Sequence, residues 1–136
     1  MNMPRLLCLG YAGLFFFVAI MGYIPQFVDE AGLLFGLFAL DLYDNLLHAF
    51  SGVWALAAAL ISVRQSILYL KLFGIIYGLD GIVGLFLGNA FLDFGIFAHG
   101  VASNTFIENF WLNIPHILIG GGAMFAGFIL SRHTRD

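Results

Sequence analysis

Residues 67–88 read ILYLKLFGIIYGLDGIVGLFLG, and this run decides the kind of fold. A helix that crosses a bilayer needs about 20 largely apolar residues, and only Lys71 and Asp80 are charged here. Glycine recurs every three or four positions, at Gly74, Gly78, Gly81, Gly84 and Gly88. Small residues at helical spacing allow two helices to approach closely in lipid. The run therefore predicts a transmembrane helix with one face against another helix.

Three further runs have the same character: Leu6–Ile24, Asn45–Val63 and Phe110–Ser131. Hydrophobic residues make up 62% of the 136-residue chain and charged residues 10%, far from the balance of a soluble domain. The fold class predicted is therefore an all-α membrane protein with four transmembrane helices, with lipids as its surroundings. Two apolar stretches of about 20 residues join the first span to the second and the third to the fourth, and we expect them to be interfacial helices or re-entrant segments.

The charged residues predict an orientation. Basic residues fall at the two ends of the chain and between the second and third spans: Arg5, Arg64, Lys71, Arg132 and Arg135. Most acidic residues fall in the two long joins. The positive-inside rule then places both termini in the cytoplasm of a bacterial inner or photosynthetic membrane. A formal charge of −3 without a basic patch argues against a nucleic-acid partner.

The chain also contains an internal repeat. A shift of 68 positions aligns Asn45, His48 and Gly52 with three residues of the second half. These counterparts are Asn113, His116 and Gly120. The same shift places Gly10 and Gly13 on Gly78 and Gly81. We therefore predict two parallel repeats of helix, interfacial segment and helix, residues 1–68 and 69–136, that together form one membrane domain.

His48 and His116 are the main candidate functional residues, because the small residues beside them turn both toward the bundle. Each could hydrogen-bond to a neighbouring asparagine or span, act as an axial ligand of a tetrapyrrole such as chlorophyll or haem, or belong to a proton relay. Asp80 lies near mid-membrane, where a carboxylate is costly. It could orient His116, take part in a relay, or remain neutral and bonded to Tyr11, Tyr77 or a backbone carbonyl.

Asp41, Asp44 and His48 share one helical face if the second span starts early, and could hold a divalent cation. An acidic helix start that complements the helix dipole is the simpler interpretation. The single cysteine, Cys8, excludes an intrachain disulfide and a cysteine-based zinc site. We find no motif for nucleophilic catalysis, a phosphate loop or a zinc protease, so we do not expect an enzyme.

Three stretches resemble a bacterial family of small four-span membrane proteins of unknown function (DUF4383-like). They are DNLLHAFSGVWALAAAL from Asp44, YLKLFGIIYGLDGIVGLFLG from Tyr69 and NFWLNIPHILIGGGAMFAG from Asn109. The resemblance covers about residues 41–132 and implies architecture and location but no reaction. It marks His48 and His116 as motif positions. Pro115, where the first copy has Leu47, departs from the pattern.

These features lead us to expect a non-enzymatic accessory or structural subunit of a larger membrane complex, of the photosynthetic or respiratory type. Sixteen phenylalanines in so small a chain favour contact with other membrane subunits, a second copy or a pigment. The alternatives are a tetrapyrrole-binding module that uses His48 and His116, and a small proton or ion conductor around Asp80.

The orientation can be tested with a reporter fused after Arg135. We expect alkaline phosphatase to be inactive and green fluorescent protein to be fluorescent at this position, because the basic residues place the C-terminus in the cytoplasm. Activity of the phosphatase fusion in intact cells would reverse the orientation.

Overall fold

The computed structural model describes residues 2–134, and its regular structure is helical. The elements are α1 (Met3–Met21), η1 (Pro25–Phe27), α2 (Leu42–Ile61), α3 (Val63–Leu87), α4 (Gly95–His99) and α5 (Phe106–His133). Four of them, α1, α2, α3 and α5, are long and apolar enough to cross a membrane. The prediction of an all-α membrane protein with four spans is confirmed.

The spans begin three to four residues before the predicted ones, and polar side chains cap the first turns of α2, α3 and α5. Asp41 accepts a hydrogen bond from the Asp44 amide at the start of α2, and the Asp44 side chain accepts one from the Asp41 amide. Thr105 and Glu108 form the same reciprocal arrangement at α5. Such capping boxes satisfy amides that have no partner within the helix. A single residue, Ser62, separates α2 from α3 and caps α3.

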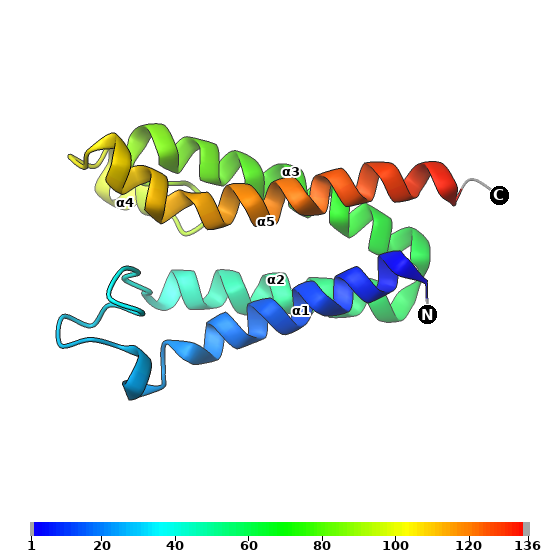
Figure 1. Ribbon diagram of the computed structural model, residues 1–136, viewed down its shortest axis with the longest axis horizontal. Helices are drawn as coiled ribbons and strands as arrows, with labels where there is room; N and C mark the ends of the chain where they lie inside the picture. The colour runs from blue at the N-terminus through cyan, green and yellow to red at the C-terminus, as the bar shows by residue number, and fades with distance from the viewer. Residues whose placement is uncertain (1, 135–136) are drawn as a thin grey trace.

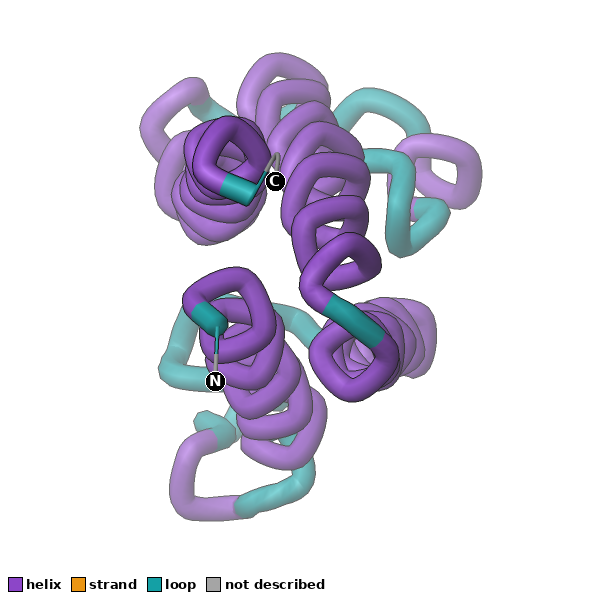
Figure 2. The backbone as a smooth tube through the Cα atoms, turned by 90° about the vertical axis from the view of Figure 1, so that its right-hand side faces the viewer, coloured by secondary structure: helices purple, strands orange, loops and turns teal. Residues whose placement is uncertain are grey.

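The helices pack as two antiparallel pairs. Figure 1 shows α1 beside α2 and α3 beside α5, and Figure 2 shows the two pairs along the bundle. The contact between α3 and α5 is the most extensive of the structure, whereas α1 and α5 touch little. Both termini of the helical bundle and the α2–α3 junction lie at one end, and the two long connectors lie at the other (Figure 1).

Glycine makes the α3–α5 contact possible. A Cβ on Gly120 would lie 2.7 Å from the Gly78 Cα, and a Cβ on Gly81 would lie 2.9 Å from the Ile117 amide nitrogen. A Cβ on Gly74 would lie 2.7 Å from the Gly120 carbonyl oxygen. These distances leave no room for a side chain, so the two backbones touch directly, as in other membrane helix pairs with small residues.

Stacked aromatic rings fill the centre of the bundle. Tyr69 and Phe73 stack with ring centroids 4.9 Å apart, and Phe73 and Tyr77 stack at 4.8 Å. Phe15 of α1 meets Phe73 edge-on at 5.2 Å. Small buried residues from the neighbouring helices surround these rings: Cys8, Ala12, Ala55, Ala58, Ala59 and Ala123. This packed aromatic core lies between the connector end and the end that carries the termini.

The two connectors are mostly irregular. The first connector (residues 22–41) contains η1 and two isolated bridges, Val28 with Leu34 and Leu34 with Phe38. The second connector (residues 88–105) contains only the short α4. The expectation of interfacial helices therefore fails for most of both segments. The second connector folds back onto the bundle, where Leu92 packs against the core.

The two halves pair their helices alike but pack them differently. In the first half, a Cβ on Gly10 or Gly13 would meet nothing within 4 Å. Their counterparts by the 68-residue shift, Gly78 and Gly81, lie in the α3–α5 contact. Gly52 faces the Phe16 ring instead of a backbone, since a Cβ there would lie 2.8 Å from that ring. The internal repeat therefore stays a prediction. The glycines that the 68-residue shift aligns pack against different groups in the two halves.

Basic residues at the end that carries the termini contact helix ends or rings. The Arg5 guanidinium donates to the carbonyls of Ala59 and Leu60, the last turn of α2, where the helix dipole favours a cation. The Lys71 ammonium lies 4.7 Å from the centre of the Phe128 ring, inside the bundle and about two turns from the α2–α3 junction. Arg135, used in the orientation argument, lies outside the described residues. The cytoplasmic location of this end stays a prediction.

Alanine substitutions can test the close helix contact. We expect Gly74→Ala and Gly120→Ala each to lower the free energy of unfolding by about 1–3 kcal/mol, because the new methyl group would overlap the facing backbone. Gly10→Ala is the matched control, since nothing lies within 4 Å of its Cβ position. Detergent-denaturation midpoints would measure the difference. Equal midpoints for Gly74→Ala and Gly10→Ala would contradict the contact.

Candidate functional site

A cavity of about 430 Å³ lies between the two helix pairs at the connector end. Both candidate histidines line it, together with Asp80, Tyr77 and Asn113. Residues 34, 35 and 37–40 of the first connector and residues 88–90 of the second also line this cavity. Its wall also carries the polar residues Asp44, Asn89, Asp93 and Asn104, and the remaining lining residues are apolar. We refer to it below as the site cavity.

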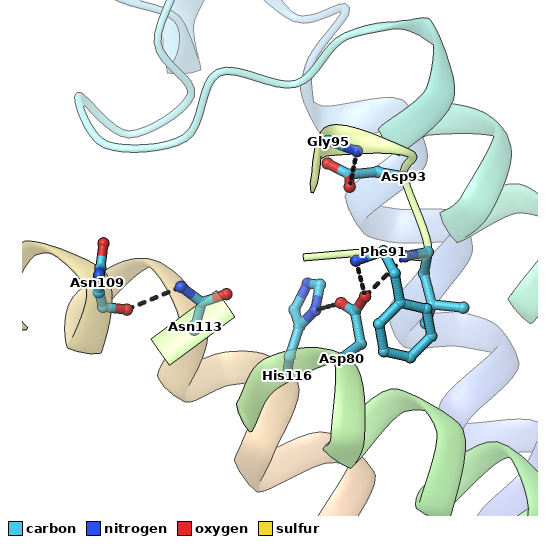
Figure 3. A network of polar contacts seen from close by, with 8 residues as sticks. Asp80, Phe91, Asp93, Gly95, Asn109, Asn113 and His116 are labelled. Atoms are coloured by element: carbon cyan, nitrogen blue, oxygen red, sulfur yellow. Dashed lines mark hydrogen bonds and ion pairs between the residues drawn. The ribbon is translucent and has the colours of Figure 1, made fainter. Parts of the chain in front are cut away.

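The structure brings Asp80 and His116 together in the site cavity. The His116 Nδ1 lies 2.8 Å from the Asp80 Oδ2, and Figure 3 shows the ring facing the carboxylate. Asp80 is 1% exposed, whereas the His116 side chain is 24% exposed. His116 also stacks on Tyr77, with ring centroids 4.3 Å apart. The pair is thus fixed in orientation by one hydrogen bond and one stacked ring.

The same carboxylate holds the second connector. The Asp80 Oδ1 accepts hydrogen bonds from the amides of Phe91 at 3.0 Å and Leu92 at 2.8 Å (Figure 3). The α3 glycines bring α5 close, and Gly88, with φ of +81°, turns the chain back so that these amides reach Asp80. Three donors around one carboxylate satisfy a charge that would otherwise be costly in a membrane. The alternative in which Asp80 bonds to Tyr11 or Tyr77 does not occur, and the Tyr11 hydroxyl donates to the Ile119 carbonyl instead.

His48 has no equivalent partner. It is 6% exposed and stacks on Phe15 with ring centroids 6.0 Å apart. Its Nδ1 is buried and has no hydrogen-bond partner among the described residues. The 68-residue shift explains the difference, because the residue that corresponds to Asp80 in the first half is Ala12. The expectation that both imidazoles bond to a neighbouring span thus holds for His116 and fails for His48.

The asparagines of the two histidine motifs do not bond to the histidines. The Asn113 side chain donates to the Asn109 carbonyl on its own helix at 2.9 Å. The Asn45 side chain donates to the Tyr23 hydroxyl at 3.5 Å. The Asn113 side chain occupies the space beside Gly84 of α3, where any residue with a side chain would overlap it. The asparagine–histidine hydrogen bond considered from the sequence is therefore wrong for both motifs.

Asp41 and Asp44 cap α2, and they have no third ligand. Within residues 2–134, no three His, Cys, Asp or Glu side chains are grouped so that they could hold a metal ion. Asp44 does line the site cavity, as does Asp93 of the second connector. The cation hypothesis gains no support from this arrangement.

Several residues of the site were missed from the sequence. Tyr77 was considered only as a hydrogen-bond partner of Asp80, and its stacking on His116 was not predicted, although it lies three positions before Asp80 on the same face of α3. The Phe91 and Leu92 amides carry no sequence signal, because backbone donors are the same in every residue. Asp93 accepts from the Gly95 amide at 2.9 Å and was assigned only to a connector.

Pro115 lines the site cavity, and α5 continues through it as one helix.

The Asp80–His116 pair can present two forms to a ligand. An ionised carboxylate only accepts hydrogen bonds, so the His116 Nδ1 carries the proton and a neutral ring leaves Nε2 as an acceptor. With one further proton, Nε2 becomes a donor. An imidazole whose other nitrogen donates to a carboxylate is also the usual arrangement of a metal-ligating histidine. The site can therefore bind a hydroxyl, a carbonyl or a metal-bearing group.

Fold and site together define the class of this protein: a four-helix, all-α membrane protein with a polar cavity at one end. The family model for a domain of unknown function (DUF4383) matches residues 5–107, more than half of the chain. The chain belongs to this family. His48 and Asp80 lie within the matched residues, and His116 lies beyond them. No curated protein and no solved structure was found to match the chain.

Hydrogen exchange can test how Asp80 supports the second connector. We expect Asp80→Ala to lower the free energy of unfolding by about 3–5 kcal/mol, because it leaves His116 and two amides without an acceptor. The Phe91 and Leu92 amides should then exchange faster than in the unaltered protein. Asp93→Ala is the control, since it should accelerate exchange at Gly95 alone. Unchanged exchange at Phe91 and Leu92 in Asp80→Ala would contradict these hydrogen bonds.

Proposed function

We propose that this chain is a non-enzymatic binding subunit of a larger membrane assembly, and that it holds a small ligand in the site cavity. The observation that carries the proposal is the Asp80–His116 pair, at 2.8 Å, on the wall of a cavity that His48 also lines. Ionisable residues inside a membrane domain are costly, so their presence points to a function. A helix contact alone would require neither the carboxylate nor the cavity.

Size and lining support a small organic ligand. A cavity of about 430 Å³ falls within the usual range for small-molecule sites, about 300–1,000 Å³. Most such sites combine apolar walls with a few polar groups that fix orientation. Here the polar groups cluster around Asp80, His116 and His48. The apolar wall comes from α1, α5 and the first connector.

A tetrapyrrole is one candidate ligand. Asp80 holds the proton of His116 on Nδ1 and leaves Nε2 as a lone-pair donor, the form that binds haem iron or chlorophyll magnesium. His48 lines the same cavity from the other helix pair. This candidate applies to His116 more strongly than to His48, because only His116 has an orienting carboxylate.

The packing supports a proton or ion conductor less well. Below the site cavity, Tyr69, Leu70 and Phe73 are at most 4% exposed, and the rings of Tyr69 and Phe73 stack directly on each other. A conducted ion would have to pass this aromatic core to reach the end that carries the termini. A site that binds from one end fits this packing better than a continuous path.

The assembly and the orientation complete the proposal. Large apolar side chains cover the outer faces of all four spans, and lipid, a second copy or other subunits would cover them. If the basic residues mark the cytoplasmic end, the site cavity lies on the opposite side of the membrane, within a bacterial inner or photosynthetic membrane.

Purification in native lipid discs, followed by solvent extraction and an absorption spectrum, would test the proposal. We expect a small molecule to co-purify with the chain at near-equal stoichiometry and to be lost from Asp80→Ala/His116→Leu, which removes both members of the pair. A visible band that Asp80→Asn removes would identify a tetrapyrrole, because the asparagine amide would donate to Nδ1 and place a proton on the ligating Nε2.

The matched control is His99→Leu, which replaces an exposed histidine outside the site cavity. It should retain the co-purified molecule. Equal amounts of extract from His99→Leu and the double variant, with both folded by circular dichroism, would contradict the proposal.

A further inference from the structure

We infer that the site cavity opens sideways to the bilayer between α1 and α5, and that it takes a lipid-soluble molecule with a flat, oxygen-bearing ring, of the quinone and quinol class. This inference rests on the proposed binding function and names its ligand. Four features carry it: the position of the opening, the cover over the water side, the form of the Asp80–His116 pair and the rings beside the histidines.

The opening follows from which side chains line the site cavity. On α1 these are Leu14, Phe17 and Val18, and on α5 they include Leu112 and Ile119. Leu14 is 38% exposed and Phe17 is 56% exposed, so the cavity wall continues onto the outer surface of the spans. Helices α1 and α5 touch little, mainly where the Tyr11 hydroxyl of α1 donates to the Ile119 carbonyl and lies beside Gly122. The outer surface at this point faces lipid.

The connectors cover the end that faces water. Leu34 is 4% exposed, and it lines the site cavity together with Phe38 and Leu40 of the same connector. A hydrogen bond from the Leu34 amide to the Phe38 carbonyl, 2.8 Å long, closes this part of the chain into a compact turn. The second connector covers the other side through its bonds to Asp80. The part of this cover that the first connector supplies is apolar, whereas the second connector adds Asn89, Asp93 and Asn104 to the lining. The apolar part favours a ligand that arrives through the lipid.

The polar wall suits a ligand that exists in two forms, one with hydroxyl groups and one with carbonyl groups. A neutral His116 accepts a hydrogen bond at Nε2 from a hydroxyl, and a protonated His116 donates one from Nε2 to a carbonyl. The Asp80 carboxylate can accept from Nδ1 in both forms. His48 adds a second imidazole that is 6% exposed and has a nitrogen without a partner among residues 2–134. Two imidazoles on one cavity can meet two oxygens of one ring.

Aromatic side chains next to the histidines favour a flat ring. Tyr77 stacks on His116, and Phe15 stacks on His48. Phe15 and Tyr77 also meet edge-on at 5.5 Å, so the two histidines lie on either side of one aromatic pair. An aromatic or quinonoid ring gains stacking energy on such a wall. The exposed Leu14 and Phe17 then provide an apolar path for a hydrocarbon tail.

Binding of decylubiquinone and decylubiquinol to the full chain in lipid discs tests the head group. We expect both to bind and decylbenzene, which has the tail but no oxygens, to bind at least about tenfold more weakly. In Asp80→Asn the amide donates to Nδ1, so Nε2 keeps a proton. Quinol affinity should then fall about tenfold while quinone affinity stays nearly constant. The amide oxygen can still accept from Phe91 and Leu92, so this variant keeps the connector in place.

Substitution at the proposed opening tests the route. Leu14→Trp adds bulk to an exposed residue that lines the site cavity, and Ile20→Trp adds the same bulk to an exposed residue of α1 that does not. We expect Leu14→Trp to slow release of decylubiquinone into excess empty vesicles by about tenfold. Ile20→Trp should release it at the rate of the unaltered chain. Equal release rates for the two variants would overturn the lateral opening.

Three results separate this inference from the proposed function. Equal affinity for decylbenzene and decylubiquinone, or equal loss of quinone and quinol in Asp80→Asn, overturns the head-group assignment. A co-purified molecule of another class, such as a haem that depends on His116, also overturns it and leaves the binding function standing. A chain that carries no co-purified molecule and binds neither probe contradicts both.

Discussion

A buried carboxylate organises the connector end of this protein. Asp80 of α3 is surrounded by the His116 ring of α5 and by the amides of Phe91 and Leu92 in the second connector. In lipid an unpaired carboxylate is unfavourable by several kcal/mol, so α3, α5 and the second connector must meet at this point for the charge to be satisfied. The shape of the site cavity follows from that requirement.

The α3–α5 glycine contact makes this convergence possible. Direct contact between Gly78 and Gly120 brings the backbones together within about one turn of Asp80 and His116, and this close approach sets the distance between their Cα atoms. The α1–α2 pair lacks such a contact and has Ala12 at the position that corresponds to Asp80. One half of the bundle is therefore closely packed and carries the Asp80–His116 pair, and the other half is looser and contributes His48, whose Nδ1 has no partner among the described residues. The site is asymmetric although the helix order repeats.

Much of the fold could be predicted from the sequence because it depends on local properties. The length and hydropathy of each run determine a span, and Asp41, Ser62 and Thr105 determine where helices begin. The pairing of Asp80 with His116 could be anticipated from their similar depth. The amides of Phe91 and Leu92 could not, because the path of the second connector depends on tertiary contacts. The repeat gave no sign that His48 lacks a partner, because it aligns the positions of His48 and His116 in the chain and not the side chains around them.

The one-residue junction at Ser62 has a consequence for how the chain enters the membrane. Ser62 accepts from the Gln65 amide, and its own carbonyl accepts from the Ser66 amide and hydroxyl, so no slack remains between α2 and α3. Two helices joined so tightly have to insert as a hairpin rather than one after the other. A translocating machinery would have to accommodate about 45 residues at once, with α1 already in place to receive them. The long connectors, by contrast, allow α1 and α5 to insert separately.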